Sequence, residues 1–261
     1  MKSLFLNLSR IIPDKLYITV IYFKNFKKII NFNKVETLNE KIQWLKLNDR
    51  KLDYIIYTDK FKVRKYISSI LGEEYLIPLL GVWDAVDEIE YENLPNPFVL
   101  KCNHDSKSVF ICKDKKNFNF ELVKNKLKNK LKQNGYWYGR EWPYKGIKPC
   151  IIAEKYMVDD SKIELKDYKI MCFNGKADNI MVCYNRNEKN VKFNYYDLSW
   201  NKLNYQKNEN ILDNSKEIKK PKKLNEMIKV AEILSEKLIF SRIITHFLMH
   251  IFHVTYDYLH S

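Results

Sequence analysis

Two lysines and two short segments have residue types and positions that could do chemistry. Lys101 ends an apolar stretch of the sequence, and the polar loop 103–108 follows it directly. Backbone amides and hydroxyls of such a loop can hold phosphate oxygens while a lysine neutralises their charge. Residues 154–157 follow another apolar stretch, and Lys60 stands near the start of an expected helix. These features predict a nucleotide site formed by Lys60, Lys101, Asn103, His104, Ser106, Ser108, Glu154, Lys155, Tyr156 and Met157.

Several residues of this predicted site have more than one interpretation. In the segment 154–157, a backbone amide and carbonyl could pair with an adenine edge while Tyr156 and Met157 pack on its faces. His104 could act as a base or a ligand, but we favour a loop histidine that is hydrogen-bonded to backbone. The aromatic run at 136–144 fits a lid over a substrate and a local core equally well.

The elements that would position the first half of this site are helices and a hairpin. Thr37 and Glu40 have the spacing of a capping box, so a helix should begin there. A second helix is expected from about residue 59 to 71, with Gly72 as its cap. Extended segments are expected at 79–83, 98–102 and 108–112, and a lysine-rich helix at 121–133.

The second half of the chain predicts more strands and one further helix. Asn174–Gly175 lies between two apolar runs and is the strongest hairpin signal in the sequence. Strands clustered between helices favour an α+β fold over a doubly wound parallel sheet. The strands are expected at 151–157, 168–173, 177–184 and 191–196, and the helix at 224–237.

Composition limits the possible partners and the compartment. The 261 residues carry a net charge of +14, which at first suggests an anionic partner. Only six of the 46 basic residues are arginines and no nucleic-acid-binding motif accompanies them, so we expect no nucleic-acid partner. The five cysteines do not form closely spaced pairs, which fits a reducing compartment. We see no signal peptide or spanning segment and expect a cytoplasmic protein.

The N-terminal segment mixes apolar and basic residues and has two interpretations. Residues 2–28 could form a basic amphipathic arm on the inner face of an anionic membrane. They could instead form a helical pair packed on the rest of the protein and broken at Pro13, which we favour.

A series of longer phrases, in order from about residue 35 to 240, resembles one family. These phrases are TLNEKIQWLKLNDRKLDY, TDKFKVRKYI, LGEEYLIPLLGVWD, LPNPFVLKCNHDS, IIAEKYM, DYKIMCFNGKAD, YYDLSWNKL and PKKLNEMIKVAEILS. Their combination is similar to the TupA-like ATP-grasp family of bacterial cell-surface polysaccharide and teichuronopeptide loci. The resemblance implies an α+β, ATP-grasp-like fold, with two antiparallel-sheet lobes and flanking helices that clamp ATP.

The resemblance also implies a reaction and further site residues. The expected enzyme is a carboxylate–amine ligase that uses ATP and Mg²⁺ and forms an acyl phosphate. Its partners would be a nucleotide and a sugar or amino-acid building block of a surface polymer. Matching motif positions place Lys169 at the γ-phosphate or acyl phosphate, with Asp167 and Arg186 as orienting residues.

The chain departs from the family pattern in two places. Family members usually carry glycine in the loop after the strand lysine, whereas residues 104–108 contain none. Beyond residue 243 the metal-binding carboxylates of the family are not found, which suggests that the C-terminal strands are truncated. We therefore divide the chain into an N-terminal arm at 1–34, an ATP-grasp-like domain at 35–240 and a divergent tail at 241–261. His246, His250 and His253 in that tail could form a metal patch, although an apolar tail is the simpler interpretation.

Two other functions stay open at this point. A glycosyltransferase would need a DxD-type metal motif after a strand, and Asp159–Asp160 is a poor match. A non-catalytic nucleotide-binding or scaffold protein is favoured by the missing carboxylates.

Overall fold

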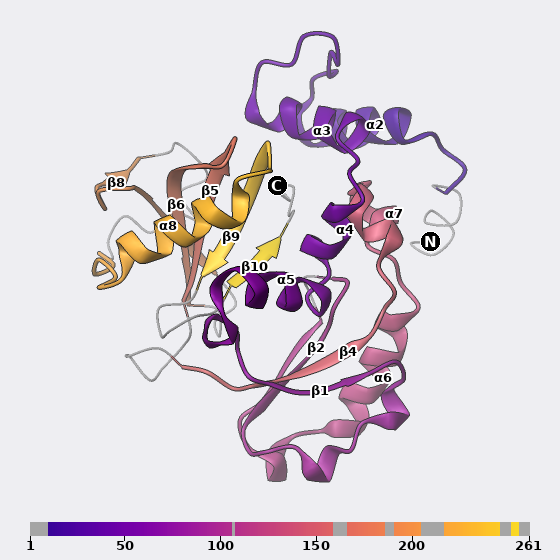
Figure 1. Ribbon diagram of the computed structural model, residues 1–261. Coiled ribbons are helices and arrows are strands. Elements are labelled where there is room, and N and C mark those ends of the chain that lie inside the picture. Colours follow the sequence, from indigo (N-terminus) through magenta and orange to yellow (C-terminus); the bar gives the residue numbers. More distant parts are fainter. Residues whose placement is uncertain are drawn as a thin grey trace. The chain divides into compact units, whose positions relative to one another are not determined.

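The computed structural model describes residues 10–105, 108–158, 166–185, 191–204, 217–245 and 252–255. They form an α+β fold with one four-stranded and one six-stranded sheet (Figure 1). The chain divides into two compact units. Among the described residues, unit 1 contains 10–61 and 81–153, and unit 2 contains Lys62–Leu80 and the described part of Glu154–Thr255.

Unit 1 is mainly helical around one small sheet. The capping box predicted at Thr37 is confirmed, since Thr37 Oγ1 accepts the Glu40 amide at 3.3 Å and Glu40 Oε2 accepts the Thr37 amide at 2.9 Å. The helices are α2 (Asp14–Phe26), α3 (Leu38–Asn48), α4 (Asp53–Thr58), α6 (Phe120–Leu131) and α7 (Tyr136–Gly139), with 3-10 turns at Val86–Glu88, Tyr91–Asn93, Lys115–Asn117 and Trp142–Gly146.

The expected aromatic loop at 136–144 is instead a pair of short helices. Tyr136 and Tyr144 are buried with Ile147 in one cluster, against which Ile55 and Trp137 pack. Of the two interpretations of these aromatics, the local core is therefore the one observed. The aromatic run forms a local core because the rings of Tyr136 and Tyr144 pack inside unit 1.

The four-stranded sheet has the order β1-β4-β2-β3. The predicted hairpin is confirmed, because β2 and β3 pair antiparallel with Lys101 opposite Val109. Phe98 and Leu100 of β2 are fully buried, and α6 packs on β2. The strands are β1 (Leu79–Trp83), β2 (Phe98–Cys102), β3 (Val109–Cys112) and β4 (Ile151–Lys155).

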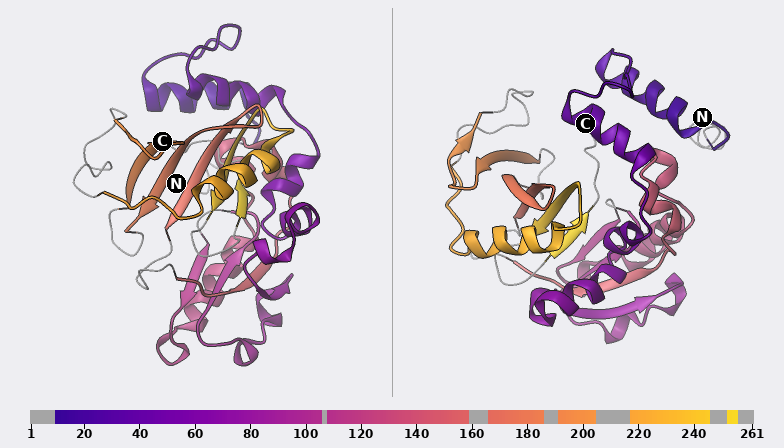
Figure 2. Two further views of the ribbon diagram at one scale, coloured as in Figure 1. Left: turned by 60° about the vertical axis from the view of Figure 1, so that its left-hand side comes forward. Right: turned by 45° about the horizontal axis from the view of Figure 1, so that its top comes forward.

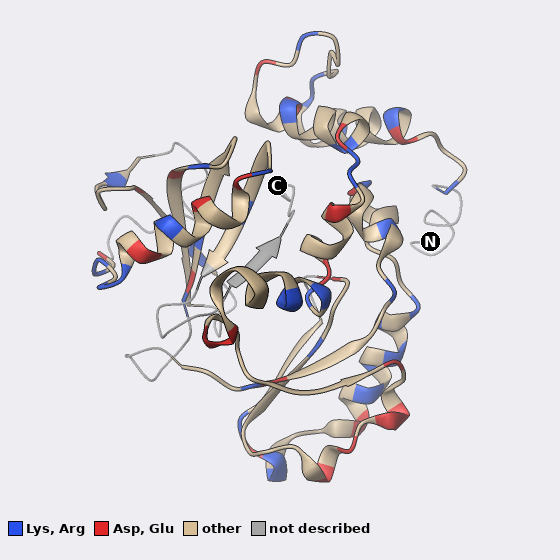
Figure 3. Ribbon diagram, in the orientation of Figure 1, with Lys and Arg blue, Asp and Glu red and all other residues tan. Residues whose placement is uncertain are grey.

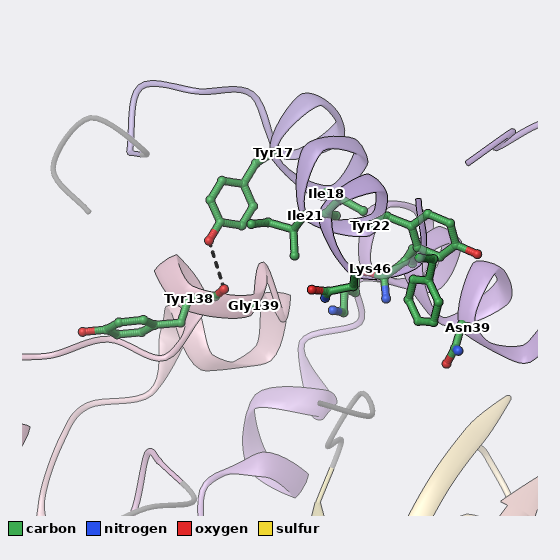
Figure 4. A pocket seen from close by; sticks show the side chains of 11 residues that line it. Tyr17, Ile18, Ile21, Tyr22, Asn39, Lys46, Tyr138 and Gly139 are labelled. Carbon is green, nitrogen blue, oxygen red and sulfur yellow. Dashed lines mark hydrogen bonds between the residues drawn. The ribbon is translucent and has the colours of Figure 1, made fainter. Parts of the chain in front are cut away.

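Helix α2 packs on α3 and α7 with one face. Figure 4 shows Tyr17, Ile18 and Tyr22 pointing toward those helices around a cavity of about 100 Å³. Tyr17 also donates a hydrogen bond to the carbonyl of Tyr138 at 3.1 Å. The side chains on this face thus hold α2 against the rest of unit 1.

A buried arginine and an aspartate join α2 to α7. Arg140 is fully buried, its Nε lies 3.2 Å from Asp14 Oδ1, and its guanidinium lies 4.2 Å from the centroid of Tyr17. Asp14 also pairs with Arg50 at 2.7 Å and accepts the hydroxyl of Tyr136 at 2.6 Å. Burial raises the pKa of Asp14, but these hydrogen bonds and positive charges outweigh it and hold the pKa below its ordinary value.

Unit 2 is built on the six-stranded sheet, whose order is β10-β9-β5-β6-β7-β8 with antiparallel neighbours. Figure 2 shows α8 (Leu224–Ser235) lying along one face of it, where it contacts β5, β6 and β9. The strands are β5 (Asp167–Phe173), β6 (Lys176–Tyr184), β7 (Lys192–Asp197), β8 (Lys202–Leu203), β9 (Phe240–Thr245) and β10 (Phe252–Thr255). Unit 2 also contains α5 (Lys62–Leu71) and a 3-10 turn at Glu73–Tyr75.

The predictions for the β5–β6 turn and for the start of α5 have different outcomes. Asn174 and Gly175 both have positive φ (49° and 75°), so the predicted hairpin turn between β5 and β6 is confirmed. The helix expected from residue 59 begins only at Lys62. The Asp59 carboxylate accepts the Phe61 amide at 2.9 Å, and this local turn replaces the first helical turn.

The segment after α8 forms strands where the structure describes it. Residues 241–245, assigned above to a divergent tail, belong to β9, which pairs with β5 along its whole length. His246 and His250 of the expected metal patch lie outside the described residues. Within the described residues, no helix is both long and apolar enough to cross a bilayer.

Candidate functional site

Two buried lysines lie at the end of β2 in unit 1. The exposed fractions of Lys101 and Lys60 are 6 % and 8 %, low values for a side chain as hydrophilic as lysine. Lys60 lies between α4 and α5, and its amide donates to the carbonyl of Asn103 at 3.1 Å. Its ammonium donates to the carbonyl of Asp105. The structure therefore brings Lys60 to the loop that follows Lys101.

Asn103 anchors this loop to two other segments. Its Nδ2 donates to Asp59 Oδ1 at 3.0 Å and to the carbonyl of Lys148 at 2.9 Å, and its Oδ1 accepts the Cys150 amide at 2.8 Å. The Asn103 amide donates to the carbonyl of Cys150 at 3.1 Å. The side chain predicted to touch phosphate is thus a positioning group in this conformation. Asp59, which the sequence analysis did not assign to the site, holds it in place.

His104 is buried and bonded to backbone, as the favoured interpretation predicts. Its Nε2 lies 3.1 Å from the carbonyl of Lys130, and its Nδ1 lies 3.2 Å from Asn103 Oδ1. Burial lowers the pKa of His104 from its ordinary 6.5, although the Lys130 carbonyl opposes this. A neutral ring has one N–H and can donate to only one of these two oxygens.

Asp105 accepts hydrogen bonds from another residue of the same loop. Asp105 Oδ1 accepts the Ser108 amide at 3.1 Å and also the Ser108 hydroxyl, whose oxygen accepts the Cys102 amide at 3.1 Å. Burial raises the pKa of Asp105, but the bonds from Ser108 and the charges of Lys60 and Lys130 keep the pKa below its ordinary value. Ser108 is therefore engaged inside the loop. Ser106 lies outside the described residues.

The predicted adenine segment lies at the end of β4, in unit 2. Glu154 is buried, and its carboxylate lies 3.2 Å from Arg64 of α5. Arg64 also donates to the carbonyl of Ile77 at 2.5 Å. The Lys155 amide donates to Pro78 at 3.0 Å while its side chain is exposed. Tyr156 and Met157 follow the strand and are half-buried.

The predicted phosphoryl-facing lysine lies on the six-stranded sheet. Lys169 of β5 is half-buried and stands opposite Met181 and Ile244. Asp167, two residues earlier on the same strand face, is buried. Arg186 lies outside the described residues.

Arg242 is a further buried cation on this sheet face. It pairs in register with Met171, which shares the strand face of Lys169, and its exposed fraction is 6 %. The sequence signal that could have identified this residue is a single arginine inside the apolar run 238–244. Its place on the sheet face that carries Lys169 depends on the pairing of β9 with β5, which the sequence did not predict.

The described residues contain no group of three or more histidine, cysteine, aspartate or glutamate side chains that could hold a metal ion. The cavity between α2, α3 and α7 is lined by none of the predicted site residues. Asp159 and Asp160 of the glycosyltransferase alternative lie outside the described residues.

Comparison with known proteins identifies the family. The sequence model described as TupA-like ATPgrasp matches residues 40–250, most of the chain. The chain belongs to the TupA-like ATP-grasp family. The family resemblance drawn from the motifs is therefore confirmed. No match was found among curated proteins.

Among solved structures, the chain is similar to a D-alanine–D-alanine ligase from Bacillus anthracis complexed with ATP. The identity is 16 % and the TM-score 0.43, with 90 % of this chain and 70 % of that chain covered. The resemblance to the family predicts a glycine in the loop after Lys101, and residues 104–108 contain none. In the segment where a glycine was expected, Asp105 instead accepts hydrogen bonds from the amide and the hydroxyl of Ser108.

Proposed function

We propose that this TupA-like ATP-grasp protein is an ATP-dependent carboxylate–amine ligase of the cytoplasm. Its product would be an amide-linked building block of a bacterial capsule or cell-wall polysaccharide. The observation that carries the nucleotide part is the pair of buried lysines, Lys60 and Lys101, gathered at one loop. Two cations gathered at one loop form a positive site, and the phosphates of a nucleotide carry the opposite charge that such a site binds.

In this proposal ATP supplies the phosphoryl group that activates a carboxylate, and an amine then displaces phosphate to give the amide. Lys60 and Lys101 would neutralise the phosphates, and the segment Glu154–Met157 would hold the adenine through its backbone. The Arg64–Glu154 pair supports this role, because it fixes the end of β4. Lys169 would stabilise the charge of the transferred group.

In this proposal, Mg²⁺ would be bound through the phosphates of the nucleotide. The described residues contain no ready cluster of metal ligands. Mg²⁺ is often held by one or two carboxylates together with substrate phosphates, so such a cluster is not required for ATP binding.

A second candidate, a non-catalytic nucleotide-binding or scaffold protein, is favoured by the loop itself. Asp105 occupies the amide and hydroxyl of Ser108, which phosphate would otherwise use, and it adds a negative charge. Both properties weaken phosphate binding at this place.

Thermal unfolding with and without Mg-ATP tests the nucleotide site. A ligand at about 100 times its dissociation constant adds about 2.7 kcal/mol to stability, so the midpoint should rise by several degrees and saturate. The rise should vanish in Lys101→Met, while the variant keeps its circular dichroism spectrum. The matched control is Lys126→Met on the exposed face of α6, which should keep the rise. No rise in the native protein, or an equal rise in Lys101→Met, contradicts the proposal.

Two variants of Asp105 separate its charge from its hydrogen bonds. Asp105→Asn removes the charge and keeps an acceptor for Ser108, whereas Asp105→Gly removes both and introduces a glycine into the loop. Nucleotide affinity should rise in the first and rise further in the second. If both leave the affinity unchanged, phosphate does not bind at this loop.

Turnover distinguishes the two candidates. A ligase releases ADP only when both a carboxylate and an amine are present, and the rate saturates in each. A midpoint rise with no ADP release over a panel of amino acids and uronic acids favours the non-catalytic protein.

A further inference from the structure

Helix α2 carries apolar side chains on two opposite faces. At about 100° per residue, Tyr17, Ile18 and Tyr22 share one side, and these are the residues that pack on unit 1. The other side holds an apolar stripe of Leu16, Val20 and Phe23 within an arc of about 60°. The exposed fractions of these three side chains are 55 %, 55 % and 50 %. Packing within unit 1 therefore accounts for only one of the two faces.

Two further exposed apolar side chains flank α2 in the sequence. Ile11 stands just before α2 with an exposed fraction of 81 %, and Ile29 follows it with 76 %. The stripe from Leu16 to Phe23 runs about 10 Å along the axis of this thirteen-residue helix. Contiguous apolar side chains of this kind mark interaction sites more often than isolated ones do.

Basic side chains border the stripe on both sides. The helical positions of Lys15 and Lys24 flank it, and Lys27 and Lys28 follow its C-terminal end, all of them exposed. Figure 3 shows the basic residues along α2 and the loop after it. The segment 10–28 contains five basic residues and one acidic residue.

The single acid of this segment does not oppose that charge. Asp14 lies on the packed side, where Arg50 and Arg140 neutralise it within 3.2 Å. The stripe therefore presents apolar side chains between positive charges, with its one carboxylate turned inward.

We propose that α2 docks this protein on an anionic lipid surface, with Leu16, Val20 and Phe23 inserted at the level of the headgroups. Helices with an apolar face bordered by lysine lie in the membrane interface in this way, since the lysine stems reach up to the phosphates. Charge complementarity selects this occupant. A second copy placed symmetrically on the stripe would bring lysines against lysines. Nucleic acid would gain nothing from the apolar centre.

The test is co-sedimentation of the full chain with vesicles. One set contains phosphatidylcholine alone and the other contains about 30 % phosphatidylglycerol. Binding should be about tenfold or more stronger on the anionic set, and it should weaken when salt is raised from about 0.1 M to about 0.5 M. Equal binding to both sets, or none to either, overturns the proposal.

Matched variants locate the contact on α2. Leu16→Gln/Val20→Gln/Phe23→Gln should lower vesicle binding about tenfold or more, and Lys15→Gln/Lys24→Gln should lower it on anionic vesicles. The controls lie on α6 and its C-cap residue Lys132; this helix is also lysine-rich and carries the exposed Leu122. Leu122→Gln and Lys126→Gln/Lys132→Gln should bind as the native protein does. Binding that survives the stripe variant, or that the α6 variants lose equally, overturns the proposal.

Two further measurements distinguish a loss of vesicle binding from unfolding and from dimer formation. The stripe side chains are exposed, so the variants should keep the native unfolding midpoint, and single Phe23→Gln serves if the triple variant does not. Analytical ultracentrifugation reports the competing occupant. A native dimer that the stripe variant converts to a monomer, without vesicle binding, assigns the face to a second copy and overturns the membrane proposal.

Discussion

At the residue scale, the loop after Lys101 is held by side chains that the sequence pattern had assigned to the ligand. Asn103 bonds to Asp59, Lys148 and Cys150, and His104 bonds to the carbonyl of Lys130. Such bonds fix the backbone from which the buried lysines project. Loss of one of these side chains should therefore change the loop before it changes any contact with a nucleotide.

His104 should make stability depend on pH. Its pKa is lowered by burial, so below about 6.5 the unfolded chain binds a proton that the folded chain does not. Stability should fall as pH drops through 6.5, by no more than about 1.4 kcal/mol at pH 5.5. Urea unfolding at several pH values checks this, with His104→Asn expected to flatten the dependence. A native protein that becomes more stable at acid pH would mean that an imidazolium sits between the two oxygens.

At the scale of elements, β4 is fixed at its end by a charge from α5. Arg64 and Glu154 are 90 residues apart in sequence, and the exposed fractions of their side chains are 14 % and 2 %. The pair ties a helix to the strand from which the predicted adenine segment continues. The pair matters for the free energy of unfolding because it is buried. If one of the two charges were removed, the other would stay desolvated without this partner.

Removing one partner of that pair should destabilise the protein strongly. Arg64→Met should lower the free energy of unfolding by about 3 kcal/mol, since it leaves the Glu154 carboxylate buried without this cation. Adding Glu154→Gln should restore part of the loss, because no charge then remains. The matched control is the exposed pair of Lys34 and Glu36 at 2.9 Å, where Lys34→Met should change stability little. Equal losses in Arg64→Met and Lys34→Met would refute the argument.

At the scale of the whole molecule, the charge of +14 comes mostly from lysines dispersed over both units (Figure 3). Dispersed lysines attract any polyanion through counterion release, but they do not read bases. The local concentration of charge beside an apolar stripe on α2 differs from this general background. The two effects should separate by their salt dependence and by their response to variants.

Nucleic acid should therefore bind this protein only non-specifically. Dissociation constants for a single-stranded and a duplex oligonucleotide should lie between about 1 and 100 µM at physiological salt and rise steeply with salt. Fluorescence anisotropy with several sequences measures this. Submicromolar binding to one sequence that persists at high salt would contradict the expectation that nucleic acid is not a partner.

The sequence by itself determined the local elements and the family. The capping box at Thr37, the turn at Asn174–Gly175 and the hairpin that carries Lys101 depend on residues a few positions apart, so their patterns are legible without the fold. The family follows from phrases distributed over most of the chain. Local bonds can also override a pattern, as the Asp59 carboxylate does at the expected start of α5.

The tertiary structure alone decided which side chains meet across long separations. Asn103 reaches Asp59 and Cys150, Arg64 reaches Glu154, and Asp14 reaches Tyr136 over 122 positions. No periodicity encodes such contacts, because they depend on how elements pack and on which buried polar group finds a partner. The same holds for α2, whose two apolar faces look alike in sequence. Packing on α3 and α7 buried one face and left the other exposed.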